Sequence, residues 1–182
     1  MGGRIARLPV FSSSSLQERL LTKIFAESAV SIETLDAHLR DSGVVPYNVQ
    51  SDHIRLRTEQ GIAFTISIIT DRKFIRYATY LPLTRHASID QKHELARRLN
   101  EEVFLPVFTI DRDGDLIVAY SLPYTGGMVA GTFVSIVNRF AAMLEFVVET
   151  YNENALIDFG PPTAVPAVAD AGSGPTGGEL LH

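Results

Sequence analysis

The stretch FTIDRDGDLIVAY, from Phe108 to Tyr120, decides the fold of this chain. The pair Asp113-Gly114 lies between two runs rich in β-branched and aromatic residues, a pattern that is typical of two strands joined by a short turn. Asp-Gly is favoured in two-residue type I′ turns, in which both turn residues take positive φ angles. The stretch therefore predicts a β-hairpin with Asp113 and Gly114 at its tip.

The predicted turn also predicts the register of the hairpin. The expected cross-strand pairs are Arg112–Asp115, Ile110–Ile117, Thr109–Val118, Phe108–Ala119 and Val107–Tyr120. Each pair joins compatible side chains, and Arg112 with Asp115 joins opposite charges. A shift by one residue would change every pair, so the register is a sharp test of this interpretation.

The hairpin tip also carries three aspartates at alternate positions, which suggests a calcium loop. An EF-hand loop needs oxygen ligands at alternate positions, glycine at position 6 and a bidentate glutamate at position 12. Counted from Asp111, position 6 is Leu116 and position 12 is Leu122, so both the turn and the last ligand are missing. We expect Asp111, Asp113 and Asp115 to be solvated, with a weakly bound surface ion or a metal-responsive switch as the alternative.

Helices are predicted on both sides of the hairpin. Ser88 and Gln91 form a capping box that begins the first helix, because each side chain can satisfy a free backbone N–H of the first turn. Its expected apolar stripe is Ile89, Leu95, Leu99 and Val103. The second helix covers about residues 129–151 and should lie across a sheet. Its expected buried face is Phe133, Val137, Phe140, Leu144 and Val147.

Upstream of these helices, three segments at 53–59, 62–70 and 74–83 have the alternation and the β-branched content of strands,. A helix from Ser31 to a stop at Gly43 precedes them,. A further capping box at Ser15 and Glu18 begins a helix whose apolar positions are Leu20, Leu21, Ile24 and Phe25,.

The order α-β-β-β-α-β-β-α predicts an α+β domain at residues 15–159, with an antiparallel sheet and its helices mainly on one face. Residues 1–14 are expected to be a flexible arm. Residues 160–182 are rich in Pro and Gly and lack apolar periodicity, so we expect a disordered tail.

Bulk composition narrows the class of protein further. The 182 residues carry a formal net charge of −5 with a pI near 5.5 and contain no cysteine. The acidic balance argues against a nucleic-acid partner, and the lack of cysteine fits a cytoplasmic protein. The apolar stretch at 129–148 is interrupted by Asn138, Arg139 and Glu145, so no membrane segment is predicted.

The segment LNEEVFLPVFTIDRDGDLIVAYSLPYTGG, from Leu99 to Gly127, together with the amphipathic helix after it, resembles the bacterial YbjN family. The resemblance covers about residues 30–155. It implies a fold like that of type III secretion chaperones and a role in regulating sensory transduction. Chaperones of that fold are typically small acidic homodimers that bind other proteins and catalyse nothing. The resemblance therefore implies a homodimer with a protein partner, and it supplies no catalytic residue.

No set of residues predicts an active site or a cofactor. His86, Asp90 and His93 are close in sequence, but a solvated helix face explains them without a metal. His38 is expected toward the polar side of its helix. The glycines of YTGGMVAG match neither phosphate-binding pattern,. We expect no enzyme, no cofactor and no metal.

The strands carry the residues that we expect to bind a protein: Arg55, Arg57, Thr65, Ser67 and Arg76. They would border an exposed sheet face suited to an acidic partner segment, and Phe64, Tyr77 and Tyr80 would contribute if their face is open. The alternative is that the arginines protect a sheet edge from aggregation.

The sequence thus favours a non-catalytic protein-binding module of the chaperone-like or regulatory kind. The alternative is a small-ligand-binding protein or an enzyme with a pocket between the sheet and the last helix, and a closed pocket with convergent polar groups would favour it.

Overall fold

The computed structural model describes residues 23–152 and 154–160. Its centre is a six-stranded sheet in the order β2-β3-β4-β5-β7-β6, with every neighbouring pair antiparallel. The strands are β2 (Asn48–Val49), β3 (His53–Arg57), β4 (Ala63–Ile69), β5 (Phe74–Leu81), β6 (Val107–Ile110) and β7 (Leu116–Pro123). The predicted α+β class and antiparallel sheet are confirmed.

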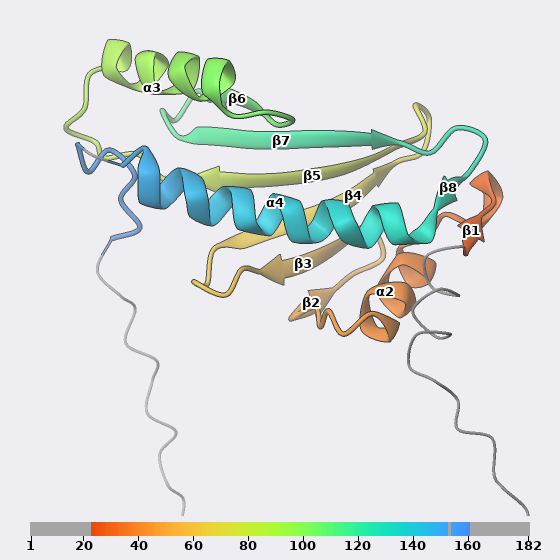
Figure 1. The fold of residues 1–182 in the computed structure, drawn as a ribbon. Helices are drawn as coiled ribbons and strands as arrows, with labels where there is room; N and C mark the ends of the chain where they lie inside the picture. Colours follow the sequence, from red (N-terminus) through yellow and green to blue (C-terminus); the bar gives the residue numbers. More distant parts are fainter. Residues whose placement is uncertain (1–22, 153, 161–182) are drawn as a thin grey trace, which may run out of the picture.

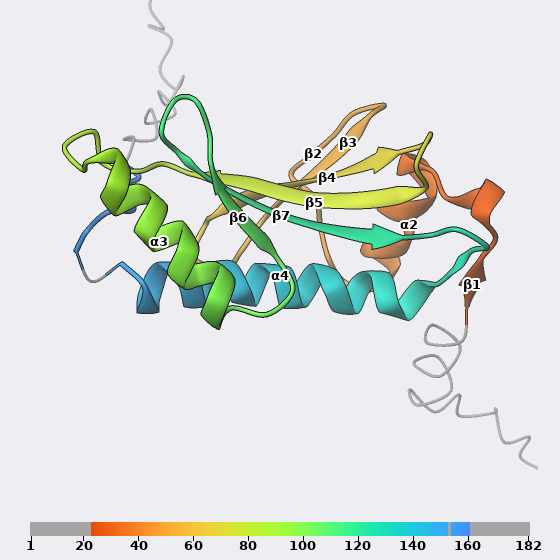
Figure 2. The same cartoon turned by 90° about the horizontal axis from the view of Figure 1, so that it is seen from above.

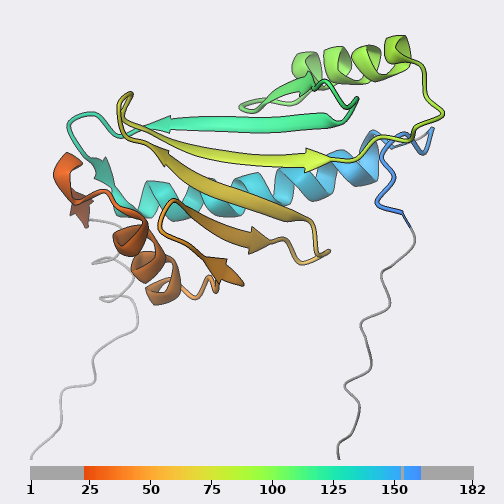
Figure 3. The ribbon, with the colours of Figure 1, turned by 180° about the vertical axis from the view of Figure 1, so that it is seen from behind.

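Three α-helices accompany the sheet in the described residues: α2 (Ile32–Asp41), α3 (Ile89–Glu102) and α4 (Ala130–Thr150). α4 runs along one face of the sheet, while α2 and α3 lie toward its opposite edges (Figures 1 and 2). From behind, the strands lie in front of α4, and no helix of the described residues covers them (Figure 3). The helices therefore lie mainly on one face, as predicted, and the other face is open.

The core lies between α4 and the sheet. The predicted face of α4 is buried: Phe133, Val137, Phe140, Leu144 and Val147 are at most 5% exposed. The ring of Tyr77 on β5 packs against Phe133, Phe140 and the β7 residue Tyr120, with centroids 5.9–6.2 Å apart. Burying one such large side chain contributes about 1.5–3 kcal/mol, so this contact fixes α4 to the sheet.

α4 is long and apolar enough to cross a membrane by length and composition alone. Core helices pass the same test, and in this fold the apolar face of α4 packs on the sheet. The length of the helix is thus explained by the sheet that it covers.

The helix starts predicted at Ser31 and Ser88 are confirmed. The Ser31 hydroxyl accepts the N–H of Thr34 at the start of α2. Ser88 and Gln91 form the complete capping box, with the Ser88 hydroxyl accepting the Gln91 N–H and the Gln91 side chain accepting the Ser88 N–H. One residue of the predicted α3 stripe is wrong, because Ile89 is 54% exposed while Leu95 and Leu99 are buried.

The hairpin exists, but its predicted register is wrong by one residue. The observed pairs are Val107–Ala119, Phe108–Val118, Thr109–Ile117 and Ile110–Leu116. Beyond these pairs the Asp111 N–H donates to the Asp115 carbonyl oxygen at 3.0 Å, which leaves a turn of Arg112, Asp113 and Gly114, and only Gly114 has positive φ, at +82°. The side chain of Asp111 accepts the N–H groups of Asp113 and Asp115, both at 2.9 Å. These bonds stabilise the longer turn, and the observed register sets Phe108 opposite Val118, both of which are buried.

The N-terminal helix prediction is also corrected at its end. Ile24 and Phe25 form strand β1 (Ile24–Phe25), which pairs with β8 (Met128–Val129) just before α4. Gly127 has a φ of +102°, and a Cβ there would lie 2.6 Å from the Phe25 carbonyl oxygen, so the close pairing requires glycine. A 3-10 turn (Glu27–Ala29) follows β1.

Several sequence predictions lie outside the described residues. They are the arm at 1–14, the capping box at Ser15–Glu18 with Leu20 and Leu21, and the tail at 161–182.

Candidate protein-binding surface

The candidate surface is the sheet face that α4 does not cover, here called the open face (Figure 3). The strand registers place the following residues on it: His53, Arg55, Arg57, Ala63, Thr65, Ser67, Arg76, Ala78, Tyr80, Val107, Thr109, Ile117, Ala119 and Ser121. All of them are exposed or half-buried, whereas their strand neighbours face the core.

The register brings the five predicted binding residues together on this face. Arg55 on β3 lies opposite Thr65 on β4. One row along, Ser67 on β4 lies opposite Arg76 on β5. Strands lie about 4.8 Å apart and alternate residues of a strand about 7 Å apart. The side chains of Arg55, Arg57 and Arg76 therefore leave the sheet at neighbouring cross-strand positions and belong to one patch.

The charge of the open face is opposite to the charge of the chain. It carries three arginines, and none of the described residues that the registers place on it is Asp or Glu. Within the described ranges, Arg55, Arg57 and Arg76 make no ion pair with an acidic side chain. Although the net charge of the protein is −5, this arrangement gives the open face a positive local potential that attracts an acidic ligand.

Two exposed aromatic side chains add to the patch, Tyr47 and the expected Tyr80. The guanidinium of Arg57 lies 4.6 Å from the ring centroid of Tyr47, a cation–π contact that orients the charge. Tyr80 is 62% exposed on the open face. The expectation that Phe64 and Tyr77 contribute is wrong, because both side chains are buried on the core side.

A shallow hollow runs over β4 and β5 on the open face. Its lining includes Thr65, Ser67, Arg76, Ala78 and Tyr80. The lining thus offers hydroxyl groups and a guanidinium, which suit an extended main chain with acidic side chains,.

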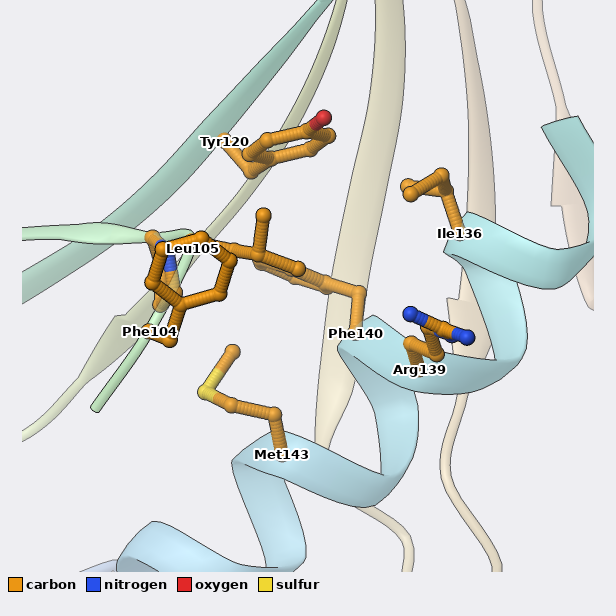
Figure 4. Close-up of a pocket in the computed structure, with 8 residues that line it drawn as sticks. Phe104, Leu105, Tyr120, Ile136, Arg139, Phe140 and Met143 are labelled. Atoms are coloured by element: carbon orange, nitrogen blue, oxygen red, sulfur yellow. The ribbon is translucent and has the colours of Figure 1, made fainter. Parts of the chain in front are cut away.

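The pocket between the sheet and α4 is small. Its walls come from the α3–β6 loop (Phe104, Leu105, Pro106), from Tyr120 on β7, and from α4 (Ile136, Arg139, Phe140, Met143) (Figure 4). Its volume is about 30 Å³, which holds about one water molecule, whereas ligand pockets measure roughly 300–1,000 Å³. This space does not support the alternative of a small-ligand site beneath α4.

Two of the hairpin aspartates, Asp111 and Asp115, accept hydrogen bonds from the backbone. Besides the two bonds accepted by Asp111, the Asp115 carboxylate accepts the N–H of Leu83 at 3.0 Å. The expectation that all three are solvated is therefore wrong for Asp111 and Asp115, while Asp113 is exposed. Within the described residues no group of three or more His, Asp or Glu is placed to hold a metal ion.

His38 is buried, contrary to the expectation that it lies toward the polar side of its helix. It is 1% exposed, and its ring meets the ring of Phe25 edge-on at 5.3 Å. Neither ring nitrogen has a hydrogen-bond partner among the described residues. Burial lowers the pKa of His38 below its ordinary value of 6.5, because a charged imidazole would be poorly solvated there. No pattern in the sequence signals this burial, since strand β1 covers the polar side of α2.

Comparison with known proteins places this fold. Residues 31–151 match the family model YbjN, described as "Putative bacterial sensory transduction regulator". The crystal structure of YbjN, a putative transcription regulator from E. coli, is similar with a TM-score of 0.59 and 18% identity, over 71% of this chain and 96% of that chain.

Two protein complexes are also similar. The HopA1-SchA chaperone-effector complex has a TM-score of 0.47 and 15% identity, over 79% of this chain and 99% of that chain. The ExsC-ExsE complex has a TM-score of 0.47 and 13% identity, over 78% and 97%. No protein with a curated description matches the sequence.

Proposed function

We propose that this chain, which belongs to the YbjN family, is a non-catalytic module that binds an acidic segment of a partner protein on its open face. The segment lies extended over β3, β4 and β5. Its carboxylates pair with Arg55, Arg57 and Arg76, while Thr65 and Ser67 offer hydroxyl groups between them.

The position of Arg76 is the main observation that supports this proposal. The alternative is that the arginines protect a sheet edge, which requires them to lie on an edge strand. Arg76 lies on β5, which has β4 on one side and β7 on the other. Edge protection therefore does not explain Arg76. An exposed, unpaired arginine in the middle of a sheet is explained by a ligand of opposite charge.

Spacing supports an extended ligand. Arg55 and Arg57 are two residues apart on one strand, and their side chains leave the sheet about 7 Å apart. An extended acidic segment presents alternate side chains at the same interval, so two of its carboxylates can meet these arginines together.

The remaining features of the proposal are a regulatory or chaperone-like role, a homodimeric assembly and a cytoplasmic location. The lack of cysteine supports the location,. The small volume beneath α4 and the absence of a reactive cluster in the described residues support a role in binding.

Site-specific crosslinking tests the proposal. A photo-crosslinking phenylalanine analogue at Tyr80 on the open face should capture a discrete protein in cells. The same analogue at Ile89, which is also exposed but lies on α3, is the matched control. Capture at Tyr80 should disappear when Arg55, Arg57 and Arg76 are changed to Gln. Equal capture at both positions, or capture that survives the three changes, would contradict the proposal.

A further inference from the structure

α4 has a second surface that the sheet does not cover, and the β3–β4 loop meets it at Glu149, whose carboxylate accepts a hydrogen bond from the Gln60 side-chain amide. Exposed positions recur along it at Arg139, Ala142, Phe146 and Glu149. Phe146 is 47% exposed and sets an aromatic ring in the middle of this surface. These four residues are called the outer stripe of α4.

We propose that a second copy of this chain covers the outer stripe, with the two α4 helices antiparallel about a two-fold axis near residue 144. This inference rests on the homodimer of the proposed function and assigns its interface.

The spacing of the stripe supports a symmetric partner. Its intervals are three, four and three residues, the spacing of a seam between two packed helices. The same intervals read identically in both directions. In a two-fold antiparallel pair, position 139 therefore meets position 149 of the second copy, and position 142 meets position 146.

The chemistry at these positions is complementary in that register. Arg139 meets Glu149 of the second copy, so two opposite-charge pairs form, one at each end. Ala142 meets Phe146 of the second copy, so the smallest side chain of the stripe receives the largest. A parallel pair would instead set Arg139 against Arg139 and Glu149 against Glu149, which is repulsive.

Phe146 is already held in place for this contact. Its ring meets the ring of Tyr151 nearly perpendicularly at 5.9 Å, and the Tyr151 hydroxyl donates a 2.9 Å hydrogen bond to the Glu102 carboxylate. A side chain fixed before binding loses little entropy on association.

The loop between α3 and β6 adds apolar area beside the stripe. Phe104 is 87% exposed, and Leu105 beside it has a φ of +98°. Figure 4 shows both side chains next to Met143 and Phe140 of α4. A stable dimer needs roughly 800 Å² from each copy, more than a single helix seam supplies, so this loop widens the interface.

A charge swap tests the interface and its register. We expect the wild-type chain to sediment as a dimer. Arg139→Glu and Glu149→Arg should each weaken dimerisation about 10- to 100-fold, because like charges then meet at both ends of the seam. The double variant, which restores opposite charges, should recover most of the wild-type affinity. Phe146→Asp should give a monomer with wild-type helix content by circular dichroism.

Arg112→Glu is the control, since it makes the same charge change at the exposed hairpin tip and should leave the dimer intact. A wild-type monomer would overturn both the homodimer and its interface. A dimer unaffected by Arg139→Glu, Glu149→Arg and Phe146→Asp would overturn this interface alone. Single variants that dissociate without recovery in the double variant would overturn the antiparallel pairing.

Discussion

The side-chain amide of Asn100 on α3 binds both backbone polar groups of Phe108 on β6. It donates to the Phe108 carbonyl oxygen at 2.8 Å and accepts the Phe108 N–H at 2.9 Å. β6 is the last strand of the sheet, with β7 on its only paired side. Asn100 thus satisfies groups that an added strand would otherwise bind, and α3 closes this edge of the sheet.

Asn100→Ala should expose this edge. The change leaves the N–H and the carbonyl of Phe108 to water, and we expect a loss of about 1–2 kcal/mol in the free energy of unfolding by urea. The open edge should also promote aggregation, measurable by light scattering as the concentration rises. Asn138→Ala on the exposed side of α4 is the control and should change neither quantity. Wild-type stability and scattering for Asn100→Ala would contradict the sealing role.

Of the three hairpin aspartates, Asp111 should contribute most to the stability of the fold. Asp111→Ala removes the acceptor of two backbone N–H groups, and we expect a loss of about 1–2 kcal/mol in the free energy of unfolding. Asp113→Ala is the matched control at the exposed tip and should cost less than about 0.5 kcal/mol. Equal costs would mean that the three-residue turn does not depend on the Asp111 side chain.

The sequence predicts the position of the hairpin turn but not the register of its strands. Asp113-Gly114 predicts the turn and its place in the chain, because only a few residue pairs tolerate positive φ. The observed register depends on hydrogen bonds that the Asp111 side chain accepts from the backbone. Matching residues across the two strands does not reveal these bonds. The two-residue strands β1, β2 and β8 are too short to show any periodicity,.

The common face of Arg55, Arg57 and Arg76 could be predicted from the sequence, whereas the burial of His38 could not. Alternation in the strands separates Arg55, Arg57 and Arg76 from the apolar face, so their common face follows from the period of two. His38 was misplaced because the short strand β1, which lies just before α2 in the chain, covers it through Phe25, and the helical period contains no information about such a partner.

The stability of the protein should depend on pH through His38. Burial lowers the pKa of this imidazole in the folded state below its ordinary value of 6.5. The unfolded chain therefore binds the proton more readily, and the free energy of unfolding should fall as the pH drops below about 6.5. The slope is at most about 1.4 kcal/mol per pH unit, and it ends at the lowered pKa of the folded state.

The charged groups that influence this imidazole are Lys23, which opposes its protonation, and Asp41, which favours it. His38→Leu should remove this part of the pH dependence, measured by urea unfolding at several pH values between 5 and 8. His86→Leu, at an exposed position, should keep it. A stability difference between wild type and His38→Leu that does not change with pH would contradict the account.

Binding of a designed peptide tests most directly whether the open face binds an extended acidic segment, as we propose. The probe is a fluorescent peptide of alternating Glu and Thr, compared by anisotropy with a peptide in which Lys replaces Glu. The acidic peptide should bind, more weakly at higher salt. Changing Arg55, Arg57 and Arg76 to Gln should reduce its affinity at least about tenfold. Changing three other exposed arginines, Arg72, Arg85 and Arg112, should have little effect. Equal loss of affinity in both triple variants, or binding of the Lys peptide instead, would contradict the account.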